Sequence, residues 1–199
     1  MNYIISFQYF NKSIALIALL FCSYFMNGQV VKFSGKILNP NSKKISVRGK
    51  GYYKIIKLDD NGNFSDTLDI KSGDFSLSDF NESTALYLQP GYDIYLTLDT
   101  KAFDETIVYK GTGERPNNFL AKYFLYNENN SLPYKEIKSM SEGEYFTHEE
   151  EYFNGVLKLL ANSSIENSQF ENQQKIRFEY NRLTNLINKS ADTYFVNTS

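Results

Sequence analysis

The run from His148 to Glu151 is the only place in the sequence where an imidazole and carboxylates come close together. His148 is the single histidine, and Glu149, Glu150 and Glu151 follow it directly. A zinc site takes three or four ligands from converging elements, so this set is incomplete. Thr147 and Glu150 have the spacing of a capping box, which begins a helix. We therefore expect His148–Glu151 to be the solvated first turn of a helix, where the dipole favours acids.

Two glycine-containing turns resemble ligand loops without completing their patterns. Asp59–Asn63 has part of a calcium loop, but Lys57 stands at the first ligand position and no Glu closes the loop. We expect an Asn-Gly hairpin turn there. Gly111–Gly113 lacks the third glycine and the Lys-Ser/Thr pair of a phosphate loop, so we expect a flexible joint. The sequence thus predicts no catalytic, cofactor-binding or metal-binding residue.

The single cysteine, Cys22, lies in a segment typical of a secretory signal peptide. Lys12 precedes an apolar run from Ile14 to Phe21, and Gly28 supplies the small residue before a cleavage site. The apolar run is shorter than the about 20 residues that cross a bilayer. We expect residues 1–28 to be removed and the chain to be exported to the periplasm or cell envelope. Lipid attachment at Cys22 is the alternative, which the large Phe21 disfavours.

Cleavage after Gly28 would leave a chain without cysteine. A disulfide, a thiolate nucleophile and a cysteine-based zinc site are then excluded. The formal net charge of −2 indicates neither nucleic acid nor an anionic membrane as a partner. From these observations we predict that the chain is not an enzyme.

Glycine and acid usage divides the remaining chain near residue 113. Residues 29–113 contain eight Gly, nine Asp and two Glu, whereas residues 114–199 contain two Gly, one Asp and eleven Glu. Asp and Gly favour turns, and Glu favours helices over strands. We therefore expect an α+β protein with a β-sandwich-like domain at 29–113 and a helical segment at 114–199.

The first half has the alternation and turn residues of an antiparallel sandwich or partly open barrel of about eight strands. The expected strands are Val30–Ile37, Ile45–Arg48, Tyr52–Leu58, Phe64–Ile70, Phe75–Asp79, Thr84–Leu88, Ile94–Leu98 and Thr106–Tyr109. Residues 29–58 carry eight Lys or Arg and no acid, whereas residues 59–113 carry eleven acids and three Lys. We expect these charges to neutralise each other across strands, with a basic surface for an anionic partner as the alternative.

The second half predicts three helices, which begin near Pro116, Thr147 and Ser168. Ser168 and Glu171 repeat the capping-box spacing. We expect this half either to dock on the sandwich or to expose the residues that would dock and self-associate. The docking residues would be Phe119, Tyr123 and the Tyr152/Phe153 stripe. Apolar residues at helical spacing also line the third helix: Ile176, Tyr180, Leu183 and Ile187.

Several segments of the chain are similar to the N-terminal region of exported TlpA-like thiol-disulfide oxidoreductases of Bacteroidetes-type bacteria. These segments are Phe33–Ile37, Ile56–Phe64, Ala85–Asp99, Phe103–Thr106, Tyr109–Gly113 and Asn117–Ala121. The resemblance implies a β-rich domain and a helical stretch before a thioredoxin domain with a Trp-Cys-x-x-Cys motif. This sequence has no Trp and no Cys-x-x-Cys, so no catalytic residue is carried over. A truncated gene, a split gene and a stand-alone module are all open.

The leading functional expectation is a non-catalytic exported module that binds or positions a partner. That partner would be a thioredoxin-like domain, another envelope protein or a second copy of the chain. One alternative is a carbohydrate-binding module, in which exposed tyrosines such as Tyr52, Tyr87 or Tyr95 form a platform. A second is a hydrolase that assembles a carboxylate site in space.

Overall fold

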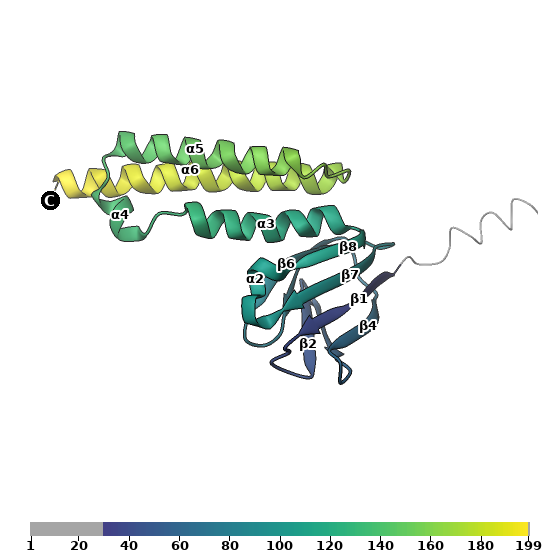
Figure 1. The fold of residues 1–199 in the computed structure, drawn as a ribbon. Helices are drawn as coiled ribbons and strands as arrows, with labels where there is room; N and C mark the ends of the chain where they lie inside the picture. Colours follow the sequence, from purple (N-terminus) through teal and green to yellow (C-terminus); the bar gives the residue numbers. More distant parts are fainter. Residues whose placement is uncertain (1–29, 199) are drawn as a thin grey trace, which may run out of the picture.

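The computed structural model describes residues 30–198 of the chain, with side chains described as far as residue 193. The expected signal peptide, its cleavage after Gly28 and the possible anchor Cys22 lie outside the described residues. The described part has eight strands in two sheets, followed by helices (Figure 1). This arrangement confirms the α+β class, and neither sheet closes into a barrel.

All eight predicted strands are present, close to their expected bounds. They are β1 (Val31–Leu38), β2 (Lys44–Gly49), β3 (Tyr52–Lys57), β4 (Asn63–Leu68), β5 (Gly73–Ser78), β6 (Ser83–Leu88), β7 (Asp93–Asp99) and β8 (Val108–Thr112). One sheet has the order β4-β1-β7-β8, and the other has the order β3-β2-β5-β6. The chain passes between the sheets after β1, β3, β4 and β6.

The pairing of β1 with β7 departs from the predicted antiparallel arrangement. These strands lie side by side in the middle of the first sheet and run parallel, with Phe33 opposite Ile94. The other strand pairs of the two described sheets are antiparallel. Parallel neighbours need a crossover connection, and here the second sheet and β4 supply it. A crossover of this kind leaves no local signal in the sequence.

The core between the sheets is apolar and follows the strand alternation. Ile94, Leu96 and Leu98 of β7 point inward, with 1% or less of each exposed. Gly35 is needed opposite them, because a Cβ atom there would lie 2.3 Å from the Leu96 carbonyl oxygen and 2.8 Å from the Phe64 ring. The period-2 pattern therefore identifies the buried face of the sandwich correctly.

The basic and acidic segments of the sandwich neutralise each other in part, as expected. Three ion pairs join them: Lys32 with Asp93, Lys43 with Asp60, and Lys54 with Asp66. The Lys54 ammonium also donates to the carbonyl of Thr67, so it bridges the edge strands β3 and β4 of the two sheets.

The helices include the three that were expected and three shorter elements that were not. After β7 come the 3₁₀ turn η1 (Thr100–Ala102) and α2 (Phe103–Thr106), before β8. The remaining helices are α3 (Glu114–Asn130), α4 (Tyr134–Ser139), α5 (Glu142–Asn162) and α6 (Ser168–Thr198). Within residues 30–198, each helix is too short or too polar to cross a bilayer.

Two predicted helix starts are wrong by a few residues. The capping box of α5 is formed by Ser141 and Glu144, so the helix begins one and a half turns before Thr147. The Thr147 hydroxyl instead donates to the Gly143 carbonyl within the helix. At α6, the side chain of Asn167 accepts from the Phe170 N–H, and Ser168 is already the first helical residue.

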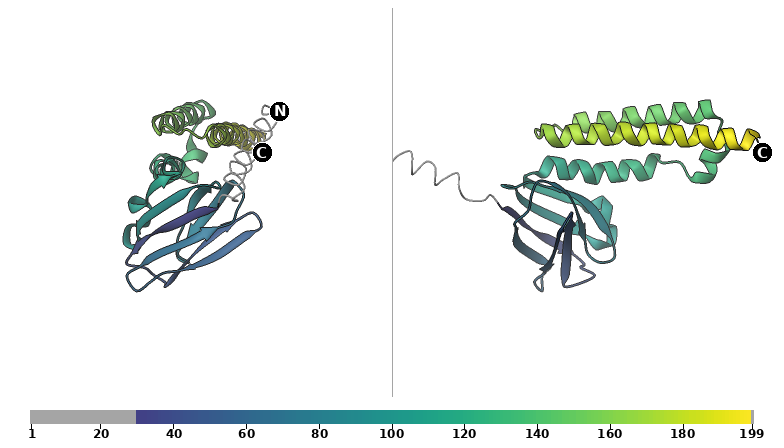
Figure 2. Two further views of the ribbon diagram at one scale, coloured as in Figure 1. Left: turned by 90° about the vertical axis from the view of Figure 1, so that its right-hand side faces the viewer. Right: turned by 180° about the vertical axis from the view of Figure 1, so that it is seen from behind.

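The helices form a layer on one side of the sandwich. α3 packs against β6 and β8, and α5 and α6 lie side by side beyond it (Figure 2). Two adjacent asparagines at the start of α3 fix this position. The Asn117 amide both accepts from the N–H of Tyr87 (2.7 Å) and donates to its carbonyl (2.9 Å). Asn118 pairs in the same way with Tyr109, at 2.8 Å for each bond.

The two asparagines pair with one edge strand of each sheet. Tyr87 lies on β6 and Tyr109 on β8, which are edge strands, and each asparagine pairs there with a donor and an acceptor. Unpaired edges invite pairing with other chains. The start of α3 therefore covers one edge of each sheet, at β6 and at β8, and holds the helical layer in place.

A second apolar cluster joins the layer to the sandwich, so the docking alternative holds. Tyr87 is fully buried against Phe170 of α6, with ring centroids 4.8 Å apart, and Phe119 of α3 lies 6.0 Å from the same ring. Phe119 therefore docks as predicted. Tyr123, Tyr152 and Phe153 pack around this cluster among the helices, away from the sheets.

Candidate functional site

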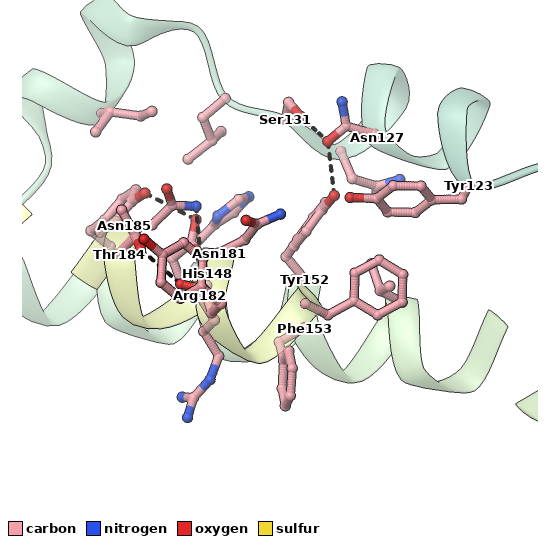
Figure 3. A pocket seen from close by; sticks show the side chains of 18 residues that line it. Tyr123, Asn127, Ser131, His148, Tyr152, Phe153, Asn181, Arg182, Thr184 and Asn185 are labelled. Atoms are coloured by element: carbon pink, nitrogen blue, oxygen red, sulfur yellow. Dashed lines mark hydrogen bonds between the residues drawn. The ribbon is translucent and has the colours of Figure 1, made fainter. Parts of the chain in front are cut away.

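A cavity of about 370 Å³ lies in the helical layer. It is lined by the end of α3, by the segment between α3 and α4, and by helices α5 and α6 (Figure 3). A volume of this order is within the range of small-molecule sites. Apart from the His148 region, the sequence analysis did not point to it, because its residues come from distant segments.

Tyrosines and an asparagine form one end of the cavity. The Tyr152 hydroxyl donates to the Asn127 side-chain oxygen at 2.8 Å, and the Ser131 hydroxyl donates to the same atom at 3.0 Å (Figure 3). Burial raises the pKa of Tyr152, and the neighbouring hydroxyl of Tyr123 adds to the shift. The Tyr152 phenol therefore stays neutral at physiological pH and acts as a hydrogen-bonding group.

The His148 region forms the other end, and its predicted setting is wrong. Because α5 begins at Glu142, His148 and Glu149 lie inside the helix, and both line the cavity. Glu149 is buried and accepts from the Tyr145 hydroxyl at 2.9 Å and from the Asn185 amide at 3.2 Å. Burial, followed by this contact with Glu149, raises the pKa of Tyr145.

His148 itself has an unusual environment. Its Nδ1 atom is buried and has no hydrogen-bond partner among the described residues. In Figure 3 its ring lies beside Asn181 and across the cavity from Tyr152. A buried polar atom without a partner costs free energy, so water or a ligand group is the natural partner at this point.

The cations near the cavity are already engaged. Arg182 pairs with Glu150 and Glu179, and its guanidinium stacks over the Phe153 ring at 4.9 Å. Lys189 is buried and donates to the carbonyls of Ile137 and Met140, each at 2.7 Å. Anionic ligands therefore find no free positive charge among the described residues that line this cavity.

The chemistry that this cavity offers is hydrogen bonding by neutral groups. Among its described lining residues, Glu149 is the only carboxylate. Hydrolysis of a glycoside by two carboxylates needs a second carboxylate on the other side of the substrate. The described residues also hold no group of three or more His, Cys, Asp or Glu that is suited to a metal ion. Glu151, the last acid of the predicted cluster, points to solvent.

The Asp59–Asn63 segment is a self-contained turn. The Asp59 carboxylate accepts from the backbone N–H groups of Asn61 and Asn63 and from the Asn63 amide, and these bonds lower its pKa. The turn joins β3 to β4, which belong to different sheets, so the predicted hairpin is wrong. Asn61 and Gly62 lie in a connection that passes from one sheet to the other.

The Gly111–Gly113 segment is packed, contrary to the expected flexible joint. Both glycines have positive φ values, and a Cβ atom at Gly113 would lie 2.3 Å from the Tyr92 ring. The Gly111 N–H donates to the Glu114 carboxylate at 3.0 Å. This segment sets the direction in which α3 leaves β8.

The three tyrosines of the carbohydrate hypothesis do not form a platform. Tyr87 is fully buried at the junction, which corrects the expectation that it is exposed. Tyr52 lies edge-on to Phe75 in the second sheet, and Tyr95 is exposed on the first sheet. The residues belong to separate surfaces.

The outer face of α6 carries the largest apolar exposure of the helical layer. Ile176, Tyr180, Leu183 and Ile187 are 70%, 69%, 45% and 67% exposed, and we call them the α6 stripe. The buried face of the same helix lies opposite and includes Phe170, Gln174, Phe178 and Lys189. The spacing of the stripe was read correctly from the sequence as a helical face. Sequence reasoning did not show that this face points to solvent.

Comparisons with known proteins add little. The chain matches no known protein-family profile, and no curated protein matches it significantly. A solved structure of a DUF3823 family protein from Bacteroides ovatus ATCC 8483 shares 11% identity with it. That match covers 35% of this chain and 43% of the other, with a TM-score of 0.27. Such a low score carries no argument about fold or function, and the resemblance to TlpA-like proteins stays a proposal.

Proposed function

We propose that this chain is a non-catalytic, exported module that binds and positions a protein partner through the α6 stripe. The observation that carries the proposal is the exposure of four large apolar side chains along one helix. Contiguous apolar patches on a protein surface mark interaction sites. The opposite face of α6 supplies the intramolecular packing, and the stripe residues belong to neither described core cluster, although Tyr180 also lines the cavity.

The resemblance to TlpA-like proteins supports the same reading. In those proteins a thioredoxin domain follows the β-rich and helical regions, and a helical layer is a natural platform for it. A thioredoxin-like domain, another protein of the periplasm or envelope, or a second copy of the chain is therefore the expected class of partner. This proposal needs no catalytic group in the chain itself.

The alternatives have weaker support from the geometry. A carbohydrate-binding module needs a flat aromatic platform or a lined groove, and its predicted tyrosines lie on separate surfaces. A hydrolase needs converging carboxylates, whereas the described cavity presents Glu149 alone. The protein-binding proposal is the one that rests on a specific surface.

Site-specific photo-cross-linking in the source organism tests the proposal. A benzophenone amino acid at position 180 should yield a covalent adduct with a defined protein, which mass spectrometry identifies. The matched control is position 53, where Tyr53 is 52% exposed on the edge strand β3. No adduct at position 180, or equal adducts at both positions, would contradict the proposal.

A second assay tests the proposal that the chain is not a catalyst. Insulin reduction by dithiothreitol is followed by turbidity with and without the purified chain. We expect the same rate in both cases. A rate that rises in proportion to the chain would show thiol-disulfide activity and would overturn this part of the proposal.

A further inference from the structure

We propose that the partner on the α6 stripe is a second copy of this chain, bound by antiparallel pairing of the two α6 helices. The inference rests on the proposed function, since it names the occupant of the same surface. Its starting point is the arrangement of the four stripe residues, whose spacing reads the same in both directions along the helix.

The stripe has the spacing of a coiled-coil seam. Ile176, Tyr180, Leu183 and Ile187 follow one another at intervals of four, three and four residues. This is the alternation of a and d positions in a heptad. A seam of this kind packs against another helix by inserting its side chains between those of the partner.

The stripe is its own complement under a two-fold axis. The midpoint of the spacing lies between Asn181 and Arg182. In an antiparallel pair centred there, Tyr180 meets Leu183 of the second copy, and Ile176 meets Ile187 of the second copy. Each layer then combines side chains of compatible size. Closed two-fold interfaces of this type are the commonest in homo-oligomers.

The residues that flank the seam permit this pairing. The flanking charges are Arg177 and Glu179, which already pair with Asp74 and Arg182 within the chain. In the antiparallel arrangement, Arg177 lies near Thr184 of the second copy, and Glu179 lies near Leu186 of the second copy. No like charges face each other across the interface. The opposed helix dipoles also favour this orientation over a parallel one.

The exposed surface and the shape of the molecule suit a dimer. The four side chains together with their flanks would bury about 1,000 Å² over the two copies, which is the lower limit of a specific interface. In the end-on view of Figure 2, no other described element lies on the side of α6 away from α5.

Light scattering over a range of concentrations tests for the dimer, with the full chain and a pair of matched variants. Leu183→Lys places a charge in the centre of the seam and should weaken dimerisation roughly tenfold or more. Leu38→Lys is the control, because Leu38 has the same exposed fraction, 45%, but lies on β1. Circular dichroism confirms that both variants fold. A monomer at all concentrations, or equal weakening by both variants, would overturn the inference.

Disulfide trapping tests the orientation. In a Cys22→Ser background, Tyr180→Cys and Leu183→Cys variants are oxidised separately and as a mixture. Antiparallel pairing predicts that the cross-linked dimer forms mainly in the mixture. Cross-linking of each variant alone to the same extent would indicate parallel pairing and would overturn the proposed geometry.

The photo-cross-link at position 180 separates this inference from the proposed function. An adduct with a second copy supports both. An adduct with a different protein, together with a monomer in solution, overturns the dimer and leaves the protein-binding function standing. If neither an adduct nor a dimer is observed, both the proposed function and the dimer are overturned.

Discussion

The sandwich and the helical layer bury their side chains in different ways. The main cluster between the sheets consists of apolar residues on alternating strand positions. In the helical layer, four polar side chains are buried as well: Asn117, Glu149, Gln174 and Lys189. The sandwich thus completes its core with its own strands, whereas the layer depends on individual polar contacts and leaves one face of α6 apolar towards solvent. This difference underlies the proposal that the sandwich is the scaffold and the helical layer binds a partner.

The largest expected effect comes from cutting the apolar link between the two regions. Phe170→Ala removes a fully buried ring that contacts both Tyr87 and Phe119. We expect the free energy of unfolding to fall by about 3–5 kcal/mol. Because the link is lost, the helical circular dichroism signal should disappear at lower urea than the hydrogen-exchange protection of the sandwich amides Ile94–Leu98.

The control for this change is Phe124→Ala, since Phe124 lies on α3, is 38% exposed and belongs to neither core cluster. It should alter the free energy of unfolding by no more than about 0.5 kcal/mol. If Phe170→Ala kept a single coincident transition with little loss of stability, the two regions would not be joined through this ring.

The two asparagines at the start of α3 offer a sharper comparison. Asn117→Leu leaves the N–H and carbonyl of Tyr87 without partners in a fully buried place, so we expect a loss of about 2–4 kcal/mol. Asn118→Leu breaks the matching bonds to Tyr109, which is also buried, but Asn118 itself is only partly buried, so we expect a smaller loss of about 1–2 kcal/mol. Urea unfolding of both variants at neutral pH measures the difference. Equal losses of unfolding free energy in the two variants would mean that the different burial of Asn117 and Asn118 does not change the strength of their contacts.

Hydrogen exchange compares the regions without mutation. In a dilute sample, amides of Ile94–Leu98 should exchange more slowly than those of Ile176–Ile187, because the outer face of α6 lacks a covering partner. Raising the concentration should slow exchange in α6 alone if copies pair there. Equal protection of both segments in a dilute monomer would show that the helices need no partner.

The smallest effect concerns acid stability. Hydrogen bonds from Asn63 and Asn61 lower the pKa of Asp59 in the sandwich, and those of Ser141 lower the pKa of Glu144 in the layer. A lowered folded pKa stabilises the protein above the ordinary carboxyl pKa of about 4, and this stabilisation is lost as the pH falls through the folded value.

In the variants Asp59→Asn and Glu144→Gln, the thermal unfolding midpoint should therefore depend less on pH below about pH 4. Thermal melts between pH 7 and pH 2 measure this, with the exposed change Glu151→Gln as the control. A control profile as flat as those of the two variants would contradict the assigned cause. A flat profile in only one of them would show that the two regions respond to acid separately.

The sequence predicts the sandwich better than the layer for a physical reason. Strand alternation reports burial directly, and the inward residues Ile94, Leu96 and Leu98 were read from it. The parallel β1–β7 pair depends on contacts between distant segments, which no local pattern records. For α6, helical spacing identifies the apolar face at Ile176 and Tyr180. The spacing does not say which of the two apolar faces of α6 is buried. In the structure, the face with Phe170 and Phe178 is buried and the face with Ile176 and Tyr180 is exposed.

The candidate site was less predictable still. The capping residues Ser141 and Glu144 begin α5 earlier than expected, and this displacement moves His148 from an exposed first turn into a cavity wall. The opposite wall comes from Asn127 and Ser131, which are distant in sequence. Only the helix start was open to inference, because Ser141 and Glu144 have the capping-box spacing.

The parallel pair at the centre of the first sheet has a consequence for the order of folding. During synthesis β1 emerges early, yet its neighbour β7 is made only after the second sheet and β4. Until then, one side of β1 has no strand to pair with, although β4 is available on the other. Contacts between distant segments slow folding. Chains interrupted before Asp99 would therefore display an unpaired strand edge, and these nascent fragments are the species for which protection by chaperones matters most.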